Sequence, residues 1–127
     1  MSGSQMPGSQ TSDKKAAVEE YFEGFRRTDR ARILALLTED VVWDLPGYKH
    51  LEGKAAFDGE IVGEGFEGSP TLELDRLLEE GDTVVAIGSG SAQQVSGDTA
   101  RFVYCDVFTF AGDLIRRVES YLVPLST

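Results

Sequence analysis

Residues 102–110 read FVYCDVFTF, an alternating pattern that predicts a β-strand with two different faces. Because alternate side chains of a strand share a face, one face carries four aromatic rings and a single carboxylate: Phe102, Tyr104, Asp106, Phe108 and Phe110. A strand face exposed to solvent does not normally carry so many rings. We therefore expect this face to point into an interior covered by helices.

The same two-residue period extends to both sides of this segment and predicts four consecutive strands, at about 71–80, 83–94, 99–110 and 114–123. The segments between them, Gly81-Asp82, Ser96-Gly97-Asp98 and Ala111-Gly112-Asp113, are typical of hairpin turns. Such spacing predicts an antiparallel meander.

Helical spacing dominates the first half of the chain. A helix is expected to begin after Ser12-Asp13, with Tyr21 and Phe25 on its apolar face, and a second helix is expected at about 29–37. A strand at 41–45 and a short third helix at 53–62 complete this half. Helices followed by a meander predict an α+β fold in which the helices cover one side of the sheet.

Length and composition favour one domain. The chain has 127 residues, of which 41% are hydrophobic, enough for a single packed core, and we assign this domain to residues 13–127. Residues 1–12 are uncharged and rich in Gly, Ser and Gln, which predicts a flexible tail that reflects a late true start or a cloning remnant. Neither a signal peptide nor a membrane span is recognisable, so a cytoplasmic protein without a membrane partner is expected.

Several classes of site and partner are disfavoured. One cysteine, Cys105, cannot form an internal disulfide, and one histidine with one cysteine cannot supply the four ligands of a structural zinc site. The net charge of −10 argues against nucleic acid. Nine acidic residues against one basic residue lie between Asp58 and Asp82, either as a solvated surface or as a docking patch for a basic partner.

The segment GEGFEG at 63–68 fits the dinucleotide-binding pattern but lacks the strand before it and the helix after it that the pattern requires. Glu64 and Glu67 would also repel a phosphate. We therefore predict that this segment is a flexible loop over the binding site and not a dinucleotide site. We expect neither a cofactor nor a metal in this protein.

Asp106 is the leading candidate for a functional residue. A buried carboxylate is unfavourable unless it is paired, hydrogen-bonded or protonated, so it marks either a reactive site or a polar group that shapes the core. Trp43 shares a strand face with Leu45 and belongs either to the core or to a pocket wall. His50 lies in a loop at 47–53 that would form the rim.

A series of short motifs occurs in a characteristic order: VEEYF (18–22), TEDVVW (38–43), LEGKAAF (51–57), EGDTVV (80–85), DVFTF (106–110), GDLI (112–115) and ESYL (119–122). In this order the chain resembles the SnoaL-like, ketosteroid-isomerase-like branch of the nuclear-transport-factor-two-like superfamily. The resemblance implies a curved antiparallel sheet that about three N-terminal helices wrap into a cone with an internal apolar pocket. It also implies a homodimer formed through the outer face of the sheet.

The resemblance also implies roles for individual residues. The protonated Asp of ketosteroid isomerases falls on Asp106 and their tyrosine donor on Tyr21, whereas the general base, which directly precedes a proline, falls on Leu45. Asp44 is one residue away and is expected on the other face of its strand.

Two further branches of the superfamily suggest other residues. For the epoxide-hydrolase branch, the last strand offers Arg117 and Glu119 on one face with Ile115, Tyr121 and Val123, but Val123 stands where a carboxylate is expected. For SnoaL-type cyclases, which need one acid to move a proton, Asp106 or Asp44 could serve.

Together these features predict a protein that binds a small apolar or cyclic metabolite. Tyr21 and Asp106 would hydrogen-bond its carbonyl or enolate, with Asp44 as a further catalytic candidate. The predicted pocket residues are Trp43, Leu45, His50, Phe102, Tyr104, Phe108, Arg117, Glu119 and Tyr121. The expected chemistry is that of a cofactor-free isomerase, cyclase or dehydratase. The alternative is a non-catalytic ligand-binding or dimeric interaction module of the same fold.

Overall fold

The computed structural model describes residues 12–63 and 65–125. Of the predicted tail at 1–12, residues 1–11 lie outside the described residues. The elements follow in the order α1 (Asp13–Arg27), α2 (Arg30–Leu34), β1 (Leu37–Leu45), β2 (Lys49–Glu52), α3 (Lys54–Glu60), β3 (Phe66–Glu80), β4 (Thr83–Gln94), β5 (Thr99–Ala111) and β6 (Leu114–Leu125).

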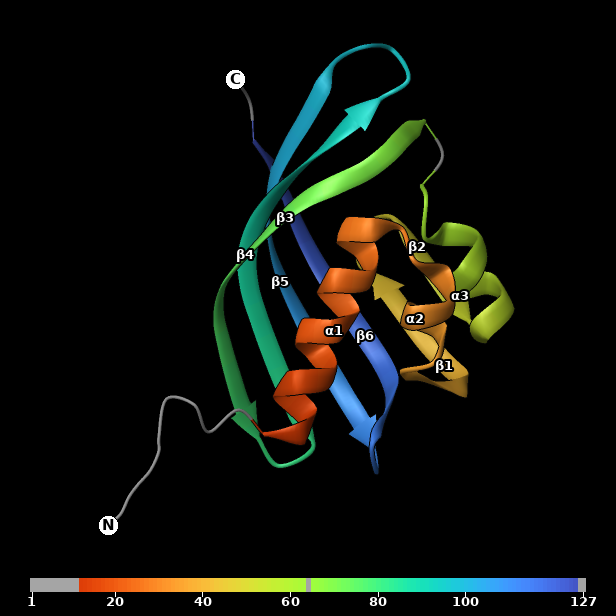
Figure 1. The fold of residues 1–127 in the computed structure, drawn as a ribbon, viewed down its shortest axis with the longest axis vertical. Coiled ribbons are helices and arrows are strands. Elements are labelled where there is room, and N and C mark those ends of the chain that lie inside the picture. Colours follow the sequence, from red (N-terminus) through yellow and green to blue (C-terminus); the bar gives the residue numbers. More distant parts are fainter. Residues whose placement is uncertain (1–11, 64, 126–127) are drawn as a thin grey trace.

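The strands form one sheet in the order β2-β1-β6-β5-β4-β3, in which β1 and β6 are parallel and all other neighbours are antiparallel. The sheet is curved and unclosed, and β3 and β4 bend over α1, which lies across it (Figure 1). The three helices cover one face, which we call the inner face. The predicted α+β fold, with a helix-wrapped cone, is confirmed.

Two of the three helices, α1 and α2, begin at residues whose side chains cap them. The Ser12 hydroxyl accepts a hydrogen bond from Lys15 N at 3.0 Å at the start of α1, and the Asp29 carboxylate accepts one from Arg32 N at 3.2 Å at the start of α2. The left-handed conformation of Thr28, with φ 51°, ends α1 and reverses the chain.

The boundaries of four predicted elements were wrong, among them the strand expected at 41–45, which is β1 and begins at Leu37. The second helix, expected to reach residue 37, ends at Leu34, because Leu37 is already the first residue of β1 and pairs with Ile115 of β6. The expected rim loop contains β2, which pairs with β1. β3 begins at Phe66 instead of residue 71, so the predicted loop at 63–68 ends within a strand.

Aromatic rings fill the interior between the helices and the inner face. Tyr21 packs edge-on against Phe108 with ring centroids 4.9 Å apart, Phe22 stacks on Tyr104 at 5.3 Å and Trp43 stacks on Phe57 at 4.3 Å. Phe108 is 0% exposed and Phe110 3%. The prediction that this face of the 102–110 strand points inward is confirmed.

Among the described residues, none of the helices combines the length and the apolar character that crossing a membrane requires.

Candidate functional site

Asp106 lies on the inner face of β5, paired with Ala86 of β4 on one side and with Ser120 of β6 on the other. Its exposure is 7%, and its Oδ1 has no hydrogen-bond partner among the described residues. Burial raises the pKa of Asp106 to about 7, and hydrogen bonding to Ser120 opposes this rise. The carboxyl group therefore keeps its proton to a higher pH than an ordinary Asp does.

Tyr21 of α1 lies near this carboxyl group. Its side chain is 2% exposed, and its pKa is raised well above 10.0, first by burial and second by the negative charge of Asp106. The hydroxyl therefore stays protonated in the physiological range and is available only as a hydrogen-bond donor or acceptor. The structure places Tyr21 near Asp106, and the donor roles that the resemblance implies for the two residues stay a prediction.

Tyr104, also near Asp106, has a different partner. Its hydroxyl donates a hydrogen bond to the carbonyl oxygen of Glu73 at 2.7 Å, and burial is the main cause that raises its pKa. This tyrosine therefore ties β5 to the backbone of β3.

Ser120 connects Asp106 to the indole of Trp43. Trp43 Nε1 donates a hydrogen bond to Ser120 Oγ at 3.0 Å, and the same hydroxyl hydrogen-bonds to Asp106. Trp43 in turn lines the wall of a cavity, so a short polar chain runs from that cavity to the buried carboxyl group.

The cavity lies at one end of the sheet, where β1, β5 and β6 approach α3 and the start of β3. It consists of a larger part of about 520 Å³ and a smaller part of about 260 Å³ that share lining residues. Most of the shared residues are apolar: Leu45, Gly63, Phe66, Ala100, Phe102 and Leu122, with Glu60 as the charged exception. Tyr48, Lys49 and Arg101 line the larger part only.

Asp106, Tyr21, Tyr104 and Phe108 are not among the residues that line this cavity. Ser120, which pairs with Asp106, is two residues along β6 from the cavity-lining Leu122. The space around Asp106 is occupied by aromatic side chains, and the hollow begins further along the strands. Of the predicted pocket residues, Trp43, Leu45 and Phe102 line it.

Asp44, His50, Arg117, Glu119 and Tyr121 form a separate cluster on the outer face of the sheet. Asp44 follows Trp43 in β1 and therefore points to the opposite face. Its carboxylate contacts both His50 Nδ1 and the Arg117 guanidinium. The structure thus does not bring these five residues together with Asp106.

Ile115, expected on the same face as Arg117, lies instead in the core at 0% exposure. The register between β5 and β6 shifts at this point, because Thr109 pairs with Arg117 whereas the next residue, Phe110, pairs with Ile115. The extra residue, Arg116, reverses the alternation of the strand.

The charges of the outer cluster stabilise one another. Hydrogen bonds to Asp44 and then to Glu52 raise the pKa of His50 above 6.5. The pKa of Asp44 is lowered from 3.8, with the hydrogen bond to His50 as the largest cause and the charge of Arg117 contributing. Both shifts favour the ionised forms.

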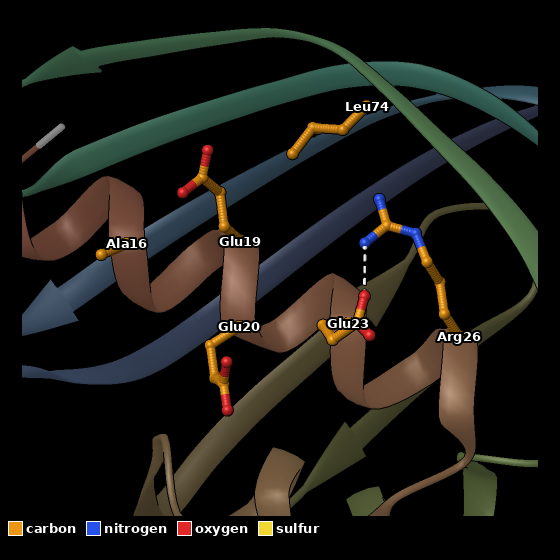
Figure 2. Close-up of a pocket in the computed structure, with 6 residues that line it drawn as sticks. All are labelled: Ala16, Glu19, Glu20, Glu23, Arg26 and Leu74. Atoms are coloured by element: carbon orange, nitrogen blue, oxygen red, sulfur yellow. Dashed lines mark hydrogen bonds and ion pairs between the residues drawn. The ribbon is translucent and has the colours of Figure 1, made fainter. Parts of the chain in front are cut away.

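A second, polar groove runs between α1 and β3. Figure 2 shows Glu19, Glu20 and Glu23 projecting from α1, with Leu74 across from them on β3. Arg26 Nη1 donates to Glu23 Oε1 at 3.1 Å. The three glutamates make the α1 side of this groove acidic. Among the described residues no group of three or more His, Cys, Asp or Glu is arranged to hold a metal ion.

Sequence reasoning did not identify several cavity residues, namely Glu60, Phe66, Ala100, Leu122 and Pro124. Strand alternation could have found three of them, because Ala100 shares a face with Phe102, and Leu122 and Pro124 share a face with Ser120. Glu60 and Phe66 reach the cavity only through the packing of α3 and β3, which no local pattern indicates.

A SnoaL-like domain profile matches residues 18–118 of the chain. No functionally curated protein matches significantly. Among solved structures, an NTF2-like protein of unknown function from Burkholderia pseudomallei is 24% identical, with a TM-score of 0.79 over 88% of this chain and 92% of that protein. TerC, co-crystallised with polyporic acid, is 25% identical, with a TM-score of 0.77 over 86% of this chain and 90% of TerC.

An LEH-like epoxide hydrolase from Mycobacterium tuberculosis is 17% identical, with a TM-score of 0.78 over 90% of this chain and 85% of that enzyme. At this identity the likeness establishes the fold and not the activity. The profile match covers most of the described domain, and the structural neighbours share its curved sheet and helices. The resemblance seen in the sequence is confirmed: the chain belongs to the SnoaL-like domain family.

Proposed function

We propose that this protein binds a small, apolar, cyclic metabolite in the cavity at the open end of the cone. The observation that carries the proposal is the cavity itself, which measures about 520 Å³ in its larger part and is lined by Leu45, Phe66, Phe102 and Leu122. Ligand sites are typically concave, mostly apolar and supplied with a few polar groups, which Lys49, Glu60 and Arg101 provide here. TerC, the neighbour crystallised with polyporic acid, supports a ligand in this fold.

A second candidate function is cofactor-free proton transfer on a bound carbonyl compound, as in an isomerase, cyclase or dehydratase. It is favoured by the buried Asp106, whose Oδ1 has no partner among the described residues and whose pKa of about 7 keeps a proton available. Leu45, the position of the expected general base, lines the cavity, and Asp44 points to the other face. The inner face therefore carries the hydrogen-bond donors Tyr21 and Asp106, but position 45 holds no general base. This arrangement favours binding over turnover.

Substitution of Ala100 by Phe should weaken ligand binding by at least about tenfold, because the added ring would occupy the shared part of the cavity. Trp43 is the only tryptophan and lines the smaller part, so quenching of its fluorescence by 2-acetylnaphthalene, a flat ketone, measures binding directly. Thr99→Phe, at the exposed neighbouring position, is the matched control and should bind as the wild type does. Failure of the wild type to bind polyporic acid or any flat ketone would refute the proposal.

The same titration tests the proton-donor role. Asp106 does not line the cavity, so donation to the ketone requires the aromatic side chains around the carboxyl group to move. If protonated Asp106 then donates to the ketone, wild-type affinity falls above about pH 7, whereas Asp106→Asn shows no such dependence. Equal affinity of the wild type on both sides of pH 7 would exclude the donor role and leave ligand binding standing.

We also propose a homodimer formed through the outer face of β5 and β6. Val103, Tyr121 and Val123 are 37–56% exposed there, and Val103 pairs with Val123 across the strands. The flanking cluster contains both signs of charge, so two copies could meet without strong repulsion.

Light scattering after size exclusion should therefore give the mass of a dimer, and Val123→Lys should give a monomer. Val95→Lys, at a valine that is 65% exposed in a hairpin away from this face, should remain dimeric. A monomeric wild type at micromolar concentration would contradict this assignment.

A further inference from the structure

A continuous chain of polar contacts crosses three strands on the outer face. It starts at Glu52 and His50 of β2, passes through Asp44 of β1 and ends at Arg117 and Glu119 of β6. Its members are close together: His50 Nε2 lies 2.8 Å from Glu52 Oε2, and Arg117 Nε lies 3.8 Å from Glu119 Oε1. The Tyr121 hydroxyl extends the chain by donating to Glu119 Oε2 at 3.1 Å.

The strand at the start of this chain, β2, is held by its pairing with β1, by the ion pair of Lys49 with Glu60 and by this chain. It has four residues, lies at the edge of the sheet and has β1 as its only strand neighbour. A short edge strand contributes few backbone hydrogen bonds, so side-chain contacts carry a larger share of its stability.

The opposite side of β2 faces the cavity. Lys49 lines the larger part of the cavity, and its Nζ pairs with Glu60 Oε1 of α3 at 2.8 Å. Because side chains alternate along β2, His50 on the outer face and Lys49 on the inner face are held by the same short segment of backbone. Movement of β2 would therefore displace Lys49 at the cavity mouth.

The contacts of His50 depend on its proton. The imidazolium donates from both ring nitrogens and can satisfy Asp44 and Glu52 together, whereas the neutral ring donates from only one. On deprotonation one of the two carboxylates loses its donor. Asp44 keeps Arg117 as a donor, whereas His50 is the only partner of the Glu52 carboxylate among the described residues. The remaining ring proton therefore favours Glu52, and the contact that weakens is the link from β2 to β1.

We propose that His50, Asp44 and Arg117 form a pH-sensitive latch that fastens β2 to the sheet and thereby holds Lys49 at the mouth of the cavity. The charged groups that face β2 from other elements are Asp44 of β1, Arg117 of β6 and Glu60 of α3, and of these only Asp44 contacts His50. The effect of the latch on a ligand rests on the proposed function, but the latch itself does not.

The direction of the pH effect follows from the shift of His50. Its contacts to two carboxylates raise its pKa above the 6.5 of a free imidazole. A group with a raised pKa stabilises the folded state fully below the unfolded value and loses that contribution as the pH rises through the folded value. The latch is thus closed below about pH 6.5 and opens at higher pH.

NMR without any ligand tests the latch directly. His50 is the only histidine, so one imidazole resonance reports its titration. Hydrogen-exchange protection of the β2 amides and of Gly53 N, which donates to Val41 O at 2.7 Å, should fall several-fold as that resonance titrates. Protection in β5 should stay constant over the same range. In the Asp44→Asn variant, the pH at which His50 is half titrated should fall.

His50→Gln and Tyr48→Phe form the matched pair of variants. In His50→Gln the hydrogen-exchange protection of the β2 amides should be low at every pH. Tyr48→Phe changes an exposed neighbour and should show the same dependence of protection on pH as the wild type. An ordinary midpoint near 6.5, or constant β2 protection while His50 titrates, would overturn the latch. Because no ligand is present, either result leaves the proposed binding function untouched.

Discussion

The protein should lose roughly 4 kcal/mol of unfolding free energy between about pH 4 and pH 7 through the ionisation of Asp106 alone, because its pKa rises from 3.8 to about 7 on folding and each unit is worth about 1.4 kcal/mol. Below pH 3.8 the carboxyl group is protonated in both the folded and the unfolded state. Between the two values only the unfolded state releases the proton, so rising pH favours unfolding. Above about pH 7 the loss is complete.

Urea denaturation of wild type and Asp106→Asn at several pH values measures this contribution as the difference between the two stability curves. The comparison is needed because Asp44 and Asp58, whose pKa values are lowered by their basic partners, act in the opposite direction at lower pH. Asp98→Asn, which removes a carboxylate from an exposed turn, serves as the control for the substitution itself. If the curve of Asp106→Asn runs parallel to that of the wild type, the carboxyl group ionises as in water and the donor role fails.

Substitution of Gly88 by Ala should destabilise the protein by about 3 kcal/mol or more, in the range of severe overpacking. A Cβ at this position would lie 1.9 Å from the carbonyl oxygen of Glu73 and 2.5 Å from the Tyr104 hydroxyl oxygen. The carbonyl belongs to the neighbouring strand β3 and cannot rotate away, so β3 must separate from β4. The hydrogen bond from Tyr104 to Glu73 would be lost with it.

The sign of this effect is diagnostic, because replacing Gly by Ala within a strand is otherwise stabilising by about 0.5–1 kcal/mol. Thermal and urea unfolding provide the measurement. Ser89→Ala, one residue along β4, should change stability little, and Tyr104→Phe should cost about 1 kcal/mol for the lost hydrogen bond. A Gly88→Ala protein as stable as the wild type would show that β3 and β4 are farther apart at this point.

The sequence was informative where a long pattern repeats. The alternation at 102–110 correctly places Asp106 among buried rings, and the hairpin turns separate the last strands correctly. It was uninformative where pairing decides the structure. The four residues of β2, KHLE, show no alternation of apolar and polar side chains and become a strand only beside β1.

The outer cluster illustrates the same limit. Asp44 and Arg117 are 73 positions apart in sequence, and their contact depends on the parallel pairing of β1 with β6. The added Arg116 in β6 moves Ile115 into the core, and a single extra residue leaves no signal in the sequence pattern. The cavity is also absent from local patterns, because it is formed by residues from the ends of all six strands and from α3.

The parallel pairing of β1 with β6 also affects how the chain acquires its fold during synthesis. β1 lies between β2 and β6, so until residues 114–125 have emerged from the ribosome, one whole edge of β1 lacks its strand partner. Contacts between such distant segments form slowly, and the apolar side of β1 stays accessible meanwhile. Until β6 has been made, the exposed apolar side of β1 therefore leaves the nascent N-terminal half prone to aggregation.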